Sequence, residues 1–390
     1  LQHNTDILNS ELDLKMAQKK VWETTASGLP HIDVKSAYVF IPNVPSLPAS
    51  FFGPSDDPNA DPNATIELGV KQNITTDITV SQLIFSGAYF VGLQATKVYY
   101  GLTKQNAEKT RLEVIETVVN TYNMIQLAEE SRIILRQNLE NIDKTLFEVS
   151  EMNKQGFLEK TDVDQLELTG NTIRNAINQI DSNLDMGYRL LKIQLGMDEA
   201  TKVELSDSLE SGESLTQSSL QLIAEPFSIE QNVDYQLIQT AEKAAKLELN
   251  LARTGYLPTI SGYYNRTEKW KTPAFDFAPK DILGINLSMP IFSSGERAAA
   301  VSQKRMALEK SVNTRKLVSS SLMMQASQYQ NDLKLKLEKY QNQKKSKELS
   351  DDIYRRTLEK YKQGMASSMD LMNSQNQYLT NLTDFYQSIF

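Results

Sequence analysis

Two long stretches without proline dominate the pattern of hydrophobic positions along the chain. The first runs from Ala88 to about Glu151, and the second from Glu296 to Lys362. Within them apolar residues recur at steps of three and four, as in Leu135, Leu139, Ile142, Leu146 and Val149, and in Tyr329, Leu333, Leu337 and Tyr340. This spacing is typical of a helix that packs along a partner helix. We predict helices over 88–151 and 296–362, the first extending roughly 95 Å at 1.5 Å per residue.

Each long helix is followed by a glycine turn, after which a helical pattern resumes. The two turns, over 153–161 and 363–368, centre on a Lys-Gln-Gly sequence and have an aspartate at the same distance after the glycine. Gly156 and Gly364 can adopt the left-handed conformation that commonly ends a helix. The pattern therefore predicts two helical hairpins. We expect the returning helices to be capped by Thr161 with Asp164, and by Ser367 with Asp370.

Four shorter stretches alternate apolar and polar residues, as half-buried strands do. We predict strands over 31–40, 65–85, 259–270 and 281–292. In the first, one face carries Ile32, Val34, Tyr38 and Phe40, and residues on the other face include Asp33, Lys35 and Ala37. A proline-rich loop over 41–62 separates the first two strands, and a shorter loop with Pro273 and Pro279 separates the last two.

The order of elements occurs twice, which indicates an internal duplication. The first repeat, 1–196, would contain a helix over 1–27, two strands, the long helix and a return helix over 161–195. The second repeat, 233–390, would contain a helix over 233–254, two strands, the long helix and a return helix over 369–390. An irregular Ser-rich connector over 197–232 separates them. Gly87 to Gly156 and Gly295 to Gly364 are both 69 residues apart, so the two long helices have equal lengths.

Four strands in one chain cannot close a barrel or cover their own unpaired edges. The long amphipathic helices likewise bury an apolar stripe only against neighbours. We therefore expect a homo-oligomer in which strands from several chains form a β-barrel at one end and helices form a tube below it. The fold class predicted is mainly α, with long antiparallel helical hairpins and a β-barrel portion.

Composition excludes several other classes of function. The chain has 390 residues, no cysteine and a formal net charge of −8 with a sequence pI near 5.1, which speaks against binding to nucleic acid. Its only histidines, His3 and His31, are not at metal-ligand spacing with an acidic cluster, and no phosphate-binding glycine loop or nucleophile elbow is present. We predict no enzyme, cofactor or metal site.

No apolar run reaches the roughly 18 residues of a membrane-spanning helix. The sequence starts with Leu-Gln-His, so we expect that any targeting segment has been removed or lies outside it.

Aromatic residues gather in and around the predicted strands. They are Tyr38, Phe40, Phe51, Phe52, Tyr263, Tyr264, Trp270, Phe275 and Phe277. Such residues are typical of the belts where a barrel meets the membrane–water interface, although core or loop positions would explain them too. Beside the alternation and the missing edge partners, they favour contact with a membrane; the outer-membrane lipid among the expected partners is implied only by the family resemblance given next.

The chain resembles the TolC family of outer-membrane efflux channels. The resemblance covers nearly the whole chain and rests on the Leu-Pro breaks at 29–30 and 257–258, the segment Leu287-Ser288-Met289-Pro290-Ile291-Phe292, and the tips 156–163 and 364–371. It implies a homotrimer with a 12-stranded barrel in the Gram-negative outer membrane and a helical tunnel that extends into the periplasm. It also implies substrate delivery from an inner-membrane transporter through a periplasmic adaptor protein, as in efflux and type I secretion.

The same resemblance assigns roles near the hairpin tips. Asp370 and Asn373 match the ring of the pore constriction; three copies of Asp370 would attract cations, although Asp370 also suits the first turn of a helix on dipole grounds. Tyr361 and Asp162 match positions that latch the closed state. The matching arginine is replaced by Ala366, and Lys362 is the candidate substitute. Residues that would contact the adaptor are Gly156, Leu158, Gly364 and Met365, the glycines also serving the tight turns.

Two alternatives remain at the level of sequence. One is a periplasmic coiled-coil scaffold that never enters a membrane. The other is the adaptor itself, which would have one helical hairpin flanked by Gly-rich β domains. The duplicated strand pairs and the equal long helices argue against both.

Overall fold

A computed structural model describes residues 2–52, 65–206, 216, 220–223, 225–272 and 276–390. The chain divides into two compact units. Unit 1 contains Leu1–Asp13, Lys104–Ile238 and Arg315–Phe390, and unit 2 contains Leu14–Thr103 and Gln239–Thr314. Four of the described helices have residues in both units: α1 (Thr5–Ala26), α2 (Gly87–Lys154), α5 (Val233–Thr254) and α6 (Glu296–Lys362).

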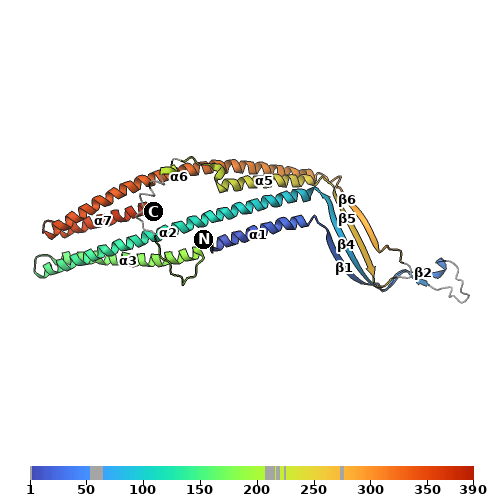
Figure 1. The fold of residues 1–390 in the computed structure, drawn as a ribbon, viewed down its shortest axis with the longest axis horizontal. Coiled ribbons are helices and arrows are strands. Elements are labelled where there is room, and N and C mark those ends of the chain that lie inside the picture. Colours follow the sequence, from blue (N-terminus) through green and yellow to red (C-terminus); the bar gives the residue numbers. More distant parts are fainter. Residues whose placement is uncertain (1, 53–64, 207–215, 217–219, 224, 273–275) are drawn as a thin grey trace. The chain divides into compact units, whose positions relative to one another are not determined.

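Unit 2 is built on a four-stranded antiparallel sheet in the order β1-β4-β5-β6 (Figure 1). Its strands are β1 (His31–Phe40), β4 (Gln72–Ser86), β5 (Thr259–Lys269) and β6 (Asp281–Ser288). The central pair, β4 and β5, joins the two halves of the chain, and a β-bulge lies between Leu83 and Phe85. The strands β1 and β6 are the two edges of this sheet within the chain.

The register gives the sheet one apolar and one polar face. Partnered residues point to the same side of a sheet, so one row crosses all four strands as Ile32, Val80, Tyr264 and Leu283. The neighbouring row on the opposite face begins with Asp33, Thr79 and Asn265. Asn265 donates a hydrogen bond to Thr79 Oγ1 at 3.1 Å on that polar face. The alternation predicted for residues 31–40 therefore extends to β4 and β5 in these two rows. The polar row ends at Ile282 of β6, and the next row on the apolar face, Val34 and Ile78, continues to Arg266 and Asp281.

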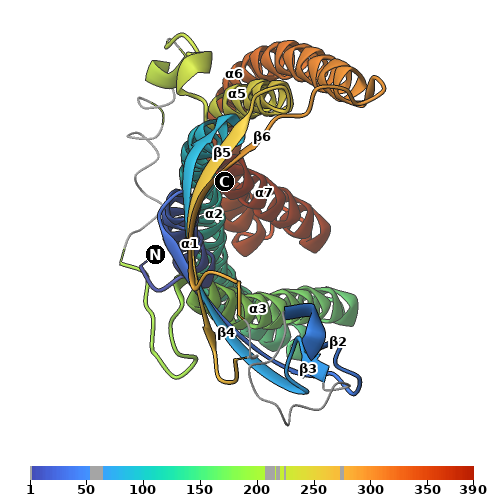
Figure 2. The same cartoon turned by 90° about the vertical axis from the view of Figure 1, so that its right-hand side faces the viewer.

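Strand bounds differ from the sequence prediction at three places. The strand predicted over 65–85 is two strands, β3 (Thr65–Glu67) and β4, with Gly69 in the break between them. β3 pairs with β2 (Ser46–Pro48), which lies in the range predicted as loop (Figures 1 and 2). The predicted strand over 281–292 ends at Ser288, which pairs with Thr259, the first residue of β5. β5 ends one residue earlier than predicted, at Lys269.

The remainder of the predicted loop over 41–62 is partly described. A short 3₁₀ helix, η1 (Ala49–Phe52), follows β2. Residues 53–64, which include three of the prolines of the predicted loop, lie outside the described residues, and so does Phe275 of the predicted aromatic belt. Of the predicted connector 197–232, the positions 207–215, 217–219 and 224 also lie outside; its described part contains a helical turn at 220–223 and the 3₁₀ helix η3 (Ile229–Gln231).

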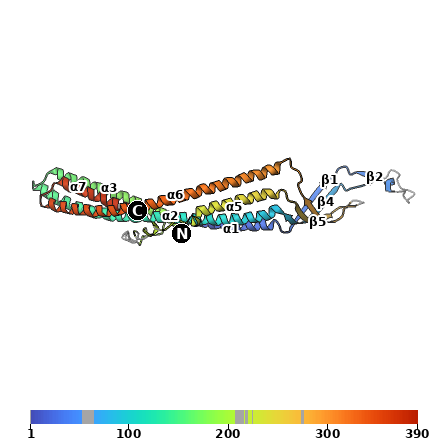
Figure 3. The same ribbon diagram turned by 90° about the horizontal axis from the view of Figure 1, so that it is seen from above.

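Unit 1 contains the ends of two helical hairpins. The first hairpin joins α2 to α3 (Lys160–Leu195), and the second joins α6 to α7 (Ser368–Ile389); α5 (Val233–Thr254) precedes β5. Both turns lie at the same end of unit 1 (Figures 1 and 3). The helix α3 ends at Gly196, whose φ of 67° is left-handed, and its N–H bonds back to Ile193 O.

The core of the first hairpin is a stripe along α2 and α3. It contains Ile142, Val149, Leu166, Ile173 and Ile177. The predicted α2 positions Leu135, Leu139 and Leu146 pack against this cluster, as do Tyr361 and Leu379 of the second hairpin. Ile142 and Val149 are 1% exposed, so the three- and four-residue steps mark a true packing seam. No helix among the described residues is apolar over enough of its length to cross a bilayer.

Candidate functional site at the hairpin tips

The two hairpin turns have the same backbone construction. Gly156 has φ 80° and Gly364 has φ 71°, the left-handed values expected of them. In the first turn Phe157 N–H bonds to Met152 O at 3.0 Å, and in the second Met365 N–H bonds to Lys360 O at 2.8 Å. In each turn, the N–H of the residue after the glycine thus bonds to a carbonyl in the last turn of the helix, which would otherwise have no hydrogen-bond partner.

The returning helix of the second hairpin is capped as expected. Ser367 Oγ accepts a hydrogen bond from Asp370 N–H at 3.1 Å, and the Asp370 carboxylate accepts from Ser367 N–H at 3.1 Å and from Ser367 Oγ at 2.7 Å. The side-chain hydrogen bond from Ser367, followed by the backbone one, lowers the pKa of Asp370 below its ordinary value. Its own cap therefore favours the ionised form of the carboxylate at the predicted constriction.

The cap of the first hairpin differs from the prediction. Glu159, and not Thr161, is the N-cap of α3, and Asp162, and not Asp164, is the third residue whose carboxylate accepts from the cap N–H, at 3.2 Å. Thr161 Oγ1 instead donates to Glu159 Oε2 at 3.1 Å. The helix therefore begins two residues earlier than the serine/threonine rule suggested, and the side chain that bonds to the cap N–H is that of Asp162.

One side-chain hydrogen bond joins the two tips directly. Ser368 Oγ, at the first position of α7, donates to Asp162 Oδ1 at the start of α3. Asp162 was expected in a latch, but its partner Ser368 was not identified from sequence. The signal for it is modest: Ser367 already serves as the cap, which leaves the next hydroxyl available to another element.

The other two latch candidates are placed differently. Tyr361 packs against the core of the first hairpin, where burial, and secondly the Asp162 charge, raises the pKa of its hydroxyl. Among the described residues that buried hydroxyl has no hydrogen-bond partner. Lys362 is exposed and lines a cavity of about 380 Å³ with Asn138, Thr145, Tyr354, Arg355 and Tyr378.

The predicted constriction residues share the outer side of α7. Asp370 and Asn373 are exposed, whereas Leu371, Ser374 and Gln375 are buried against the rest of unit 1. The three-residue step between Asp370 and Asn373 places them close together on one face. Both side chains are thus available to line a passage if other chains lie opposite.

The apolar tip residues separate into inward and outward positions. Leu158 packs against the core of the first hairpin, and its carbonyl accepts from Asn153 Nδ2 at 2.7 Å. Met365 is 66% exposed, and Phe157, which was not identified from sequence, is 76% exposed. Helical spacing could not separate these roles, because the turn follows no helical period.

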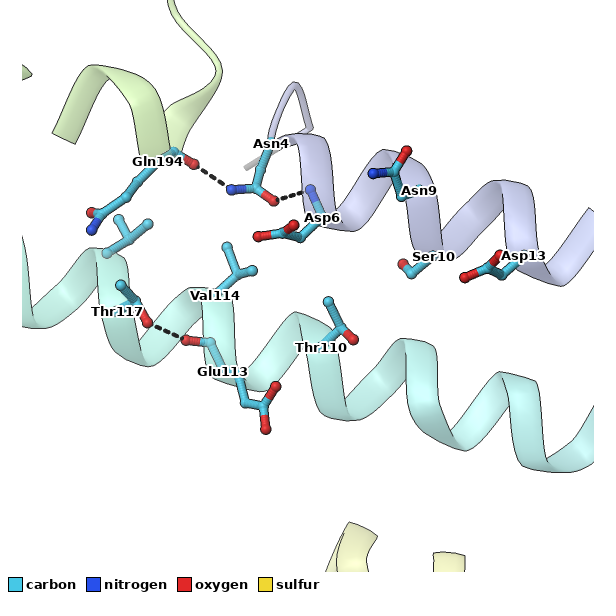
Figure 4. Close-up of a pocket in the computed structure, with 11 residues that line it drawn as sticks. Asn4, Asp6, Asn9, Ser10, Asp13, Thr110, Glu113, Val114, Thr117 and Gln194 are labelled. Carbon is cyan, nitrogen blue, oxygen red and sulfur yellow. Dashed lines mark hydrogen bonds between the residues drawn. The ribbon is translucent and has the colours of Figure 1, made fainter. Parts of the chain in front are cut away.

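In a second polar region, a hydrogen bond from Asn4 connects the start of α1 to the end of α3 (Figure 4). Asn4 accepts from Asp6 N–H at 2.9 Å as the helix cap and donates to Gln194 O at 2.6 Å. The adjoining cavity, of about 430 Å³, is lined by Asp6, Asp13 and Glu113, but Figure 4 shows the Glu113 carboxylate directed away from the other two. No group of three or more His, Asp or Glu side chains among the described residues could hold a metal ion.

Comparison with known proteins finds a family model that matches part of the chain. Residues 228–386, which include α6, the second tip and nearly all of α7, match the family model described as outer membrane efflux protein. Over these residues the chain is similar to the outer membrane efflux protein family. No match to a curated protein sequence was found.

Solved structures of outer membrane proteins and channels share the fold. The outer membrane protein VceC of Vibrio cholerae matches with 12% identity over 100% of this chain and 90% of its own, at a TM-score of 0.75. The CmeC outer membrane channel of Campylobacter jejuni matches with 17% identity over 99% and 80%, at 0.74. The MtrE outer membrane channel of Neisseria gonorrhoeae, solved in its open state, matches with 13% identity over 100% and 86%, at 0.69. The predicted fold class, mainly helical with a small β portion, is confirmed.

Proposed function

We propose that the chain is one subunit of a passive outer-membrane channel, which receives substrates from an inner-membrane transporter through a periplasmic adaptor in efflux or type I secretion. The observation that carries the proposal is the two-faced sheet. Leu283, Ile285 and Leu287 alternate along one face of β6 and are largely exposed, whereas the opposite face of the sheet carries Asp33, Thr79 and Asn265. An apolar outer row with a polar inner row is what a lipid-facing channel wall requires.

The free edges of the sheet supply the argument for several copies. β1 and β6 each leave a row of backbone groups to pair, and in lipid every such group needs a partner. Three chains would contribute twelve strands and satisfy both edges of each sheet. A periplasmic scaffold, the alternative left open by the sequence, would have no use for an exposed apolar face such as that around Leu283.

The tips supply the argument for a constriction and for a docking end. Asp370 and Asn373, repeated in three chains, would form a ring with one carboxylate per chain, and the Ser367 cap favours the ionised form of that carboxylate. Phe157 and Met365 expose apolar side chains at the two turns, beside Gly156 and Gly364. Because Leu158 faces inward, Phe157 is the better candidate for contact with an adaptor.

Single-channel conductance in a planar bilayer tests the proposal. We expect a small, cation-preferring conductance for the parent protein and a reduced cation preference for Asp370→Ala. Asp384→Ala is the matched control, because it removes the same charge from an exposed position farther along α7. Failure of the well-folded protein to insert into the bilayer would reject the channel. An equal change in cation preference in both variants would mean that the constriction does not lie at Asp370.

A further inference from the structure

A fully buried glutamine interrupts the apolar seam between the two hairpins. Leu371, Gln375, Leu379 and Leu382 follow one another at steps of four, four and three on α7, so they share one face. Leu379 on this face packs against the core cluster of the first hairpin. Gln375 lies one turn nearer the tip and is 1% exposed. A polar side chain thus occupies a position where the pattern calls for an apolar one.

The amide of Gln375 has no partner. Neither its Nε2 nor its Oε1 makes a hydrogen bond within the part of the chain that the structure describes, and both atoms are buried. Because Gln375 is already inaccessible in the single chain, neither water nor a second copy reaches it in this packed arrangement. Leaving a buried donor and acceptor unsatisfied costs free energy that separation of the hairpins, with hydration of the amide, would recover.

Neighbouring groups make the same contact partly polar. Tyr361 also contacts the first hairpin with a buried, unpartnered hydroxyl, and one turn along from Gln375 the ring of Tyr378 lines the cavity of about 380 Å³ together with Asn138 and Thr145 of α2. Asn138 and Thr145 are buried polar residues on the α2 side. Apolar packing through Leu379 holds the hairpins together across a seam that is partly polar. Two hydrogen bonds also join them: Ser368 donates to Asp162, and Tyr386 of α7 donates to Glu130 of α2 at 3.4 Å.

We propose that the unpartnered amide of Gln375 keeps the contact between the α6–α7 and α2–α3 hairpins weak enough to break and re-form. The inference rests on the proposed channel function, since separation of the hairpins would move Asp370 and Asn373 at the constriction. An apolar side chain of similar volume at this position removes the desolvation cost while keeping the packing. Gln375→Met and Gln375→Leu should therefore hold the hairpins together for a larger fraction of the time.

Hydrogen–deuterium exchange of the intact, detergent-purified protein tests this. In Gln375→Met we expect the backbone amides of residues 371–382 to exchange about tenfold more slowly or slower still. Gln377→Met is the matched control, because Gln377 is exposed on the same helix, and its exchange should equal that of the parent. Gln375→Leu repeats the test if Gln375→Met folds poorly. Unchanged or faster exchange in a folded Gln375 variant would overturn the proposal.

Bilayer recordings on the same samples separate this inference from the channel function. Slower exchange together with a smaller or less frequently open conductance supports both. Slower exchange in a protein that forms no channel supports the weak seam and rejects the channel. A functional channel whose exchange is unaffected by Gln375→Met retains the channel and rejects the role of Gln375.

Discussion

Asp162 and Asp370 are equivalent within their hairpins but differ in what else they contact. Each is the third residue of a returning helix, and its carboxylate accepts a hydrogen bond from the N-cap N–H. Asp162 also accepts from Ser368 of the other hairpin, whereas Asp370 accepts a second bond from its own cap hydroxyl. One aspartate therefore links two elements, and the other presents a fixed charge to solvent.

The Ser368–Asp162 bond should behave as a coupled pair. We expect Ser368→Ala and Asp162→Ala each to raise the single-channel conductance, because a hydrogen bond to a charged group is worth about 1.5–3 kcal/mol. Asp162 also caps α3, so only a double-mutant cycle isolates the inter-hairpin bond. The conductance of the double variant should not exceed that of the single variant with the higher conductance. Strictly additive effects would mean that the two residues act independently.

Acidification should distinguish the capped carboxylate from an ordinary one. The Ser367 bonds depress the folded-state pKa of Asp370, so their stabilising effect is present above the ordinary aspartate pKa of about 3.9 and is lost as pH falls through the lower folded value. In Ser367→Ala the pKa should rise, and cation selectivity should disappear at a higher pH than in the parent. Reversal potentials in a salt gradient measure this. Thr383→Ala, which removes another exposed hydroxyl from α7, should titrate like the parent.

At the scale of elements, the sequence predicted the helices well and the β region less well. The long helices are proline-free and periodic, and α6 occupies the range predicted for it, Glu296–Lys362. β1 likewise occupies 31–40. The pairing of β2 with β3 could not be predicted, because a three-residue strand has no measurable period and Pro48 argued against it. Propensity rules favour loop wherever prolines gather.

The site was harder to predict because its contacts join residues distant in sequence. Nothing in local spacing connects Ser368 with Asp162, or shows that Leu158 turns inward while Phe157 turns outward. Gln375 was missed for a different reason. A pattern search counts apolar residues, so a polar residue in a buried stripe reads as a break in the pattern rather than as part of the seam.

The glycines of the two tips should be required because of their positive φ angles, and not because a side chain would lack space. A Cβ added at Gly156 or Gly364 would meet no atom within 4 Å, yet both glycines have positive φ. Gly364→Ala should therefore lower the free energy of unfolding by about 1–2 kcal/mol through backbone strain. Gly101→Ala is the matched control, since it also has open space but lies within α2; there alanine should stabilise by about 0.5–1 kcal/mol. Chemical denaturation measures both, and equal effects would contradict the strain argument.

The two faces of the sheet should respond in opposite ways to a charge. Leu283 is 84% exposed on the apolar face, and Asn265 lies on the polar face of the adjacent strand. If the apolar face contacts lipid, Leu283→Lys should reduce insertion at a cost of up to about 2–4 kcal/mol, depending on depth. Asn265→Lys should insert normally and change conductance instead. Folding yield into lipid vesicles measures the first effect, and equal yields for both variants would argue against a lipid-facing surface here.

At the scale of the whole molecule, α6 leaves an apolar stripe uncovered. Within unit 1, the exposed residues Leu317, Met324, Leu335, Leu349 and Ile353 recur at steps of 7, 11, 14 and 4, which keep to one face of a helix with 3.6 residues per turn. Only Ser350 and Tyr354 of α6 are buried within the chain. A stripe of this length costs solubility unless another surface covers it. Adjacent copies of the chain would do so in the proposed trimer.

Charge placed on this stripe should therefore separate the subunits without unfolding them. Leu335 is 62% exposed in the single chain, so Leu335→Glu removes little intrachain packing, but between subunits it would bury an unpaired carboxylate. We expect Leu335→Glu to shift the detergent-solubilised protein from trimer towards monomer in sedimentation analysis, with its helix content kept. Lys336→Glu introduces the same side chain at the next, exposed position and should leave the trimer intact. If Leu335→Glu remains a trimer, the subunit contact lies on another face of α6. If the parent protein is itself a monomer, the proposal that three chains close the sheet into a barrel is wrong.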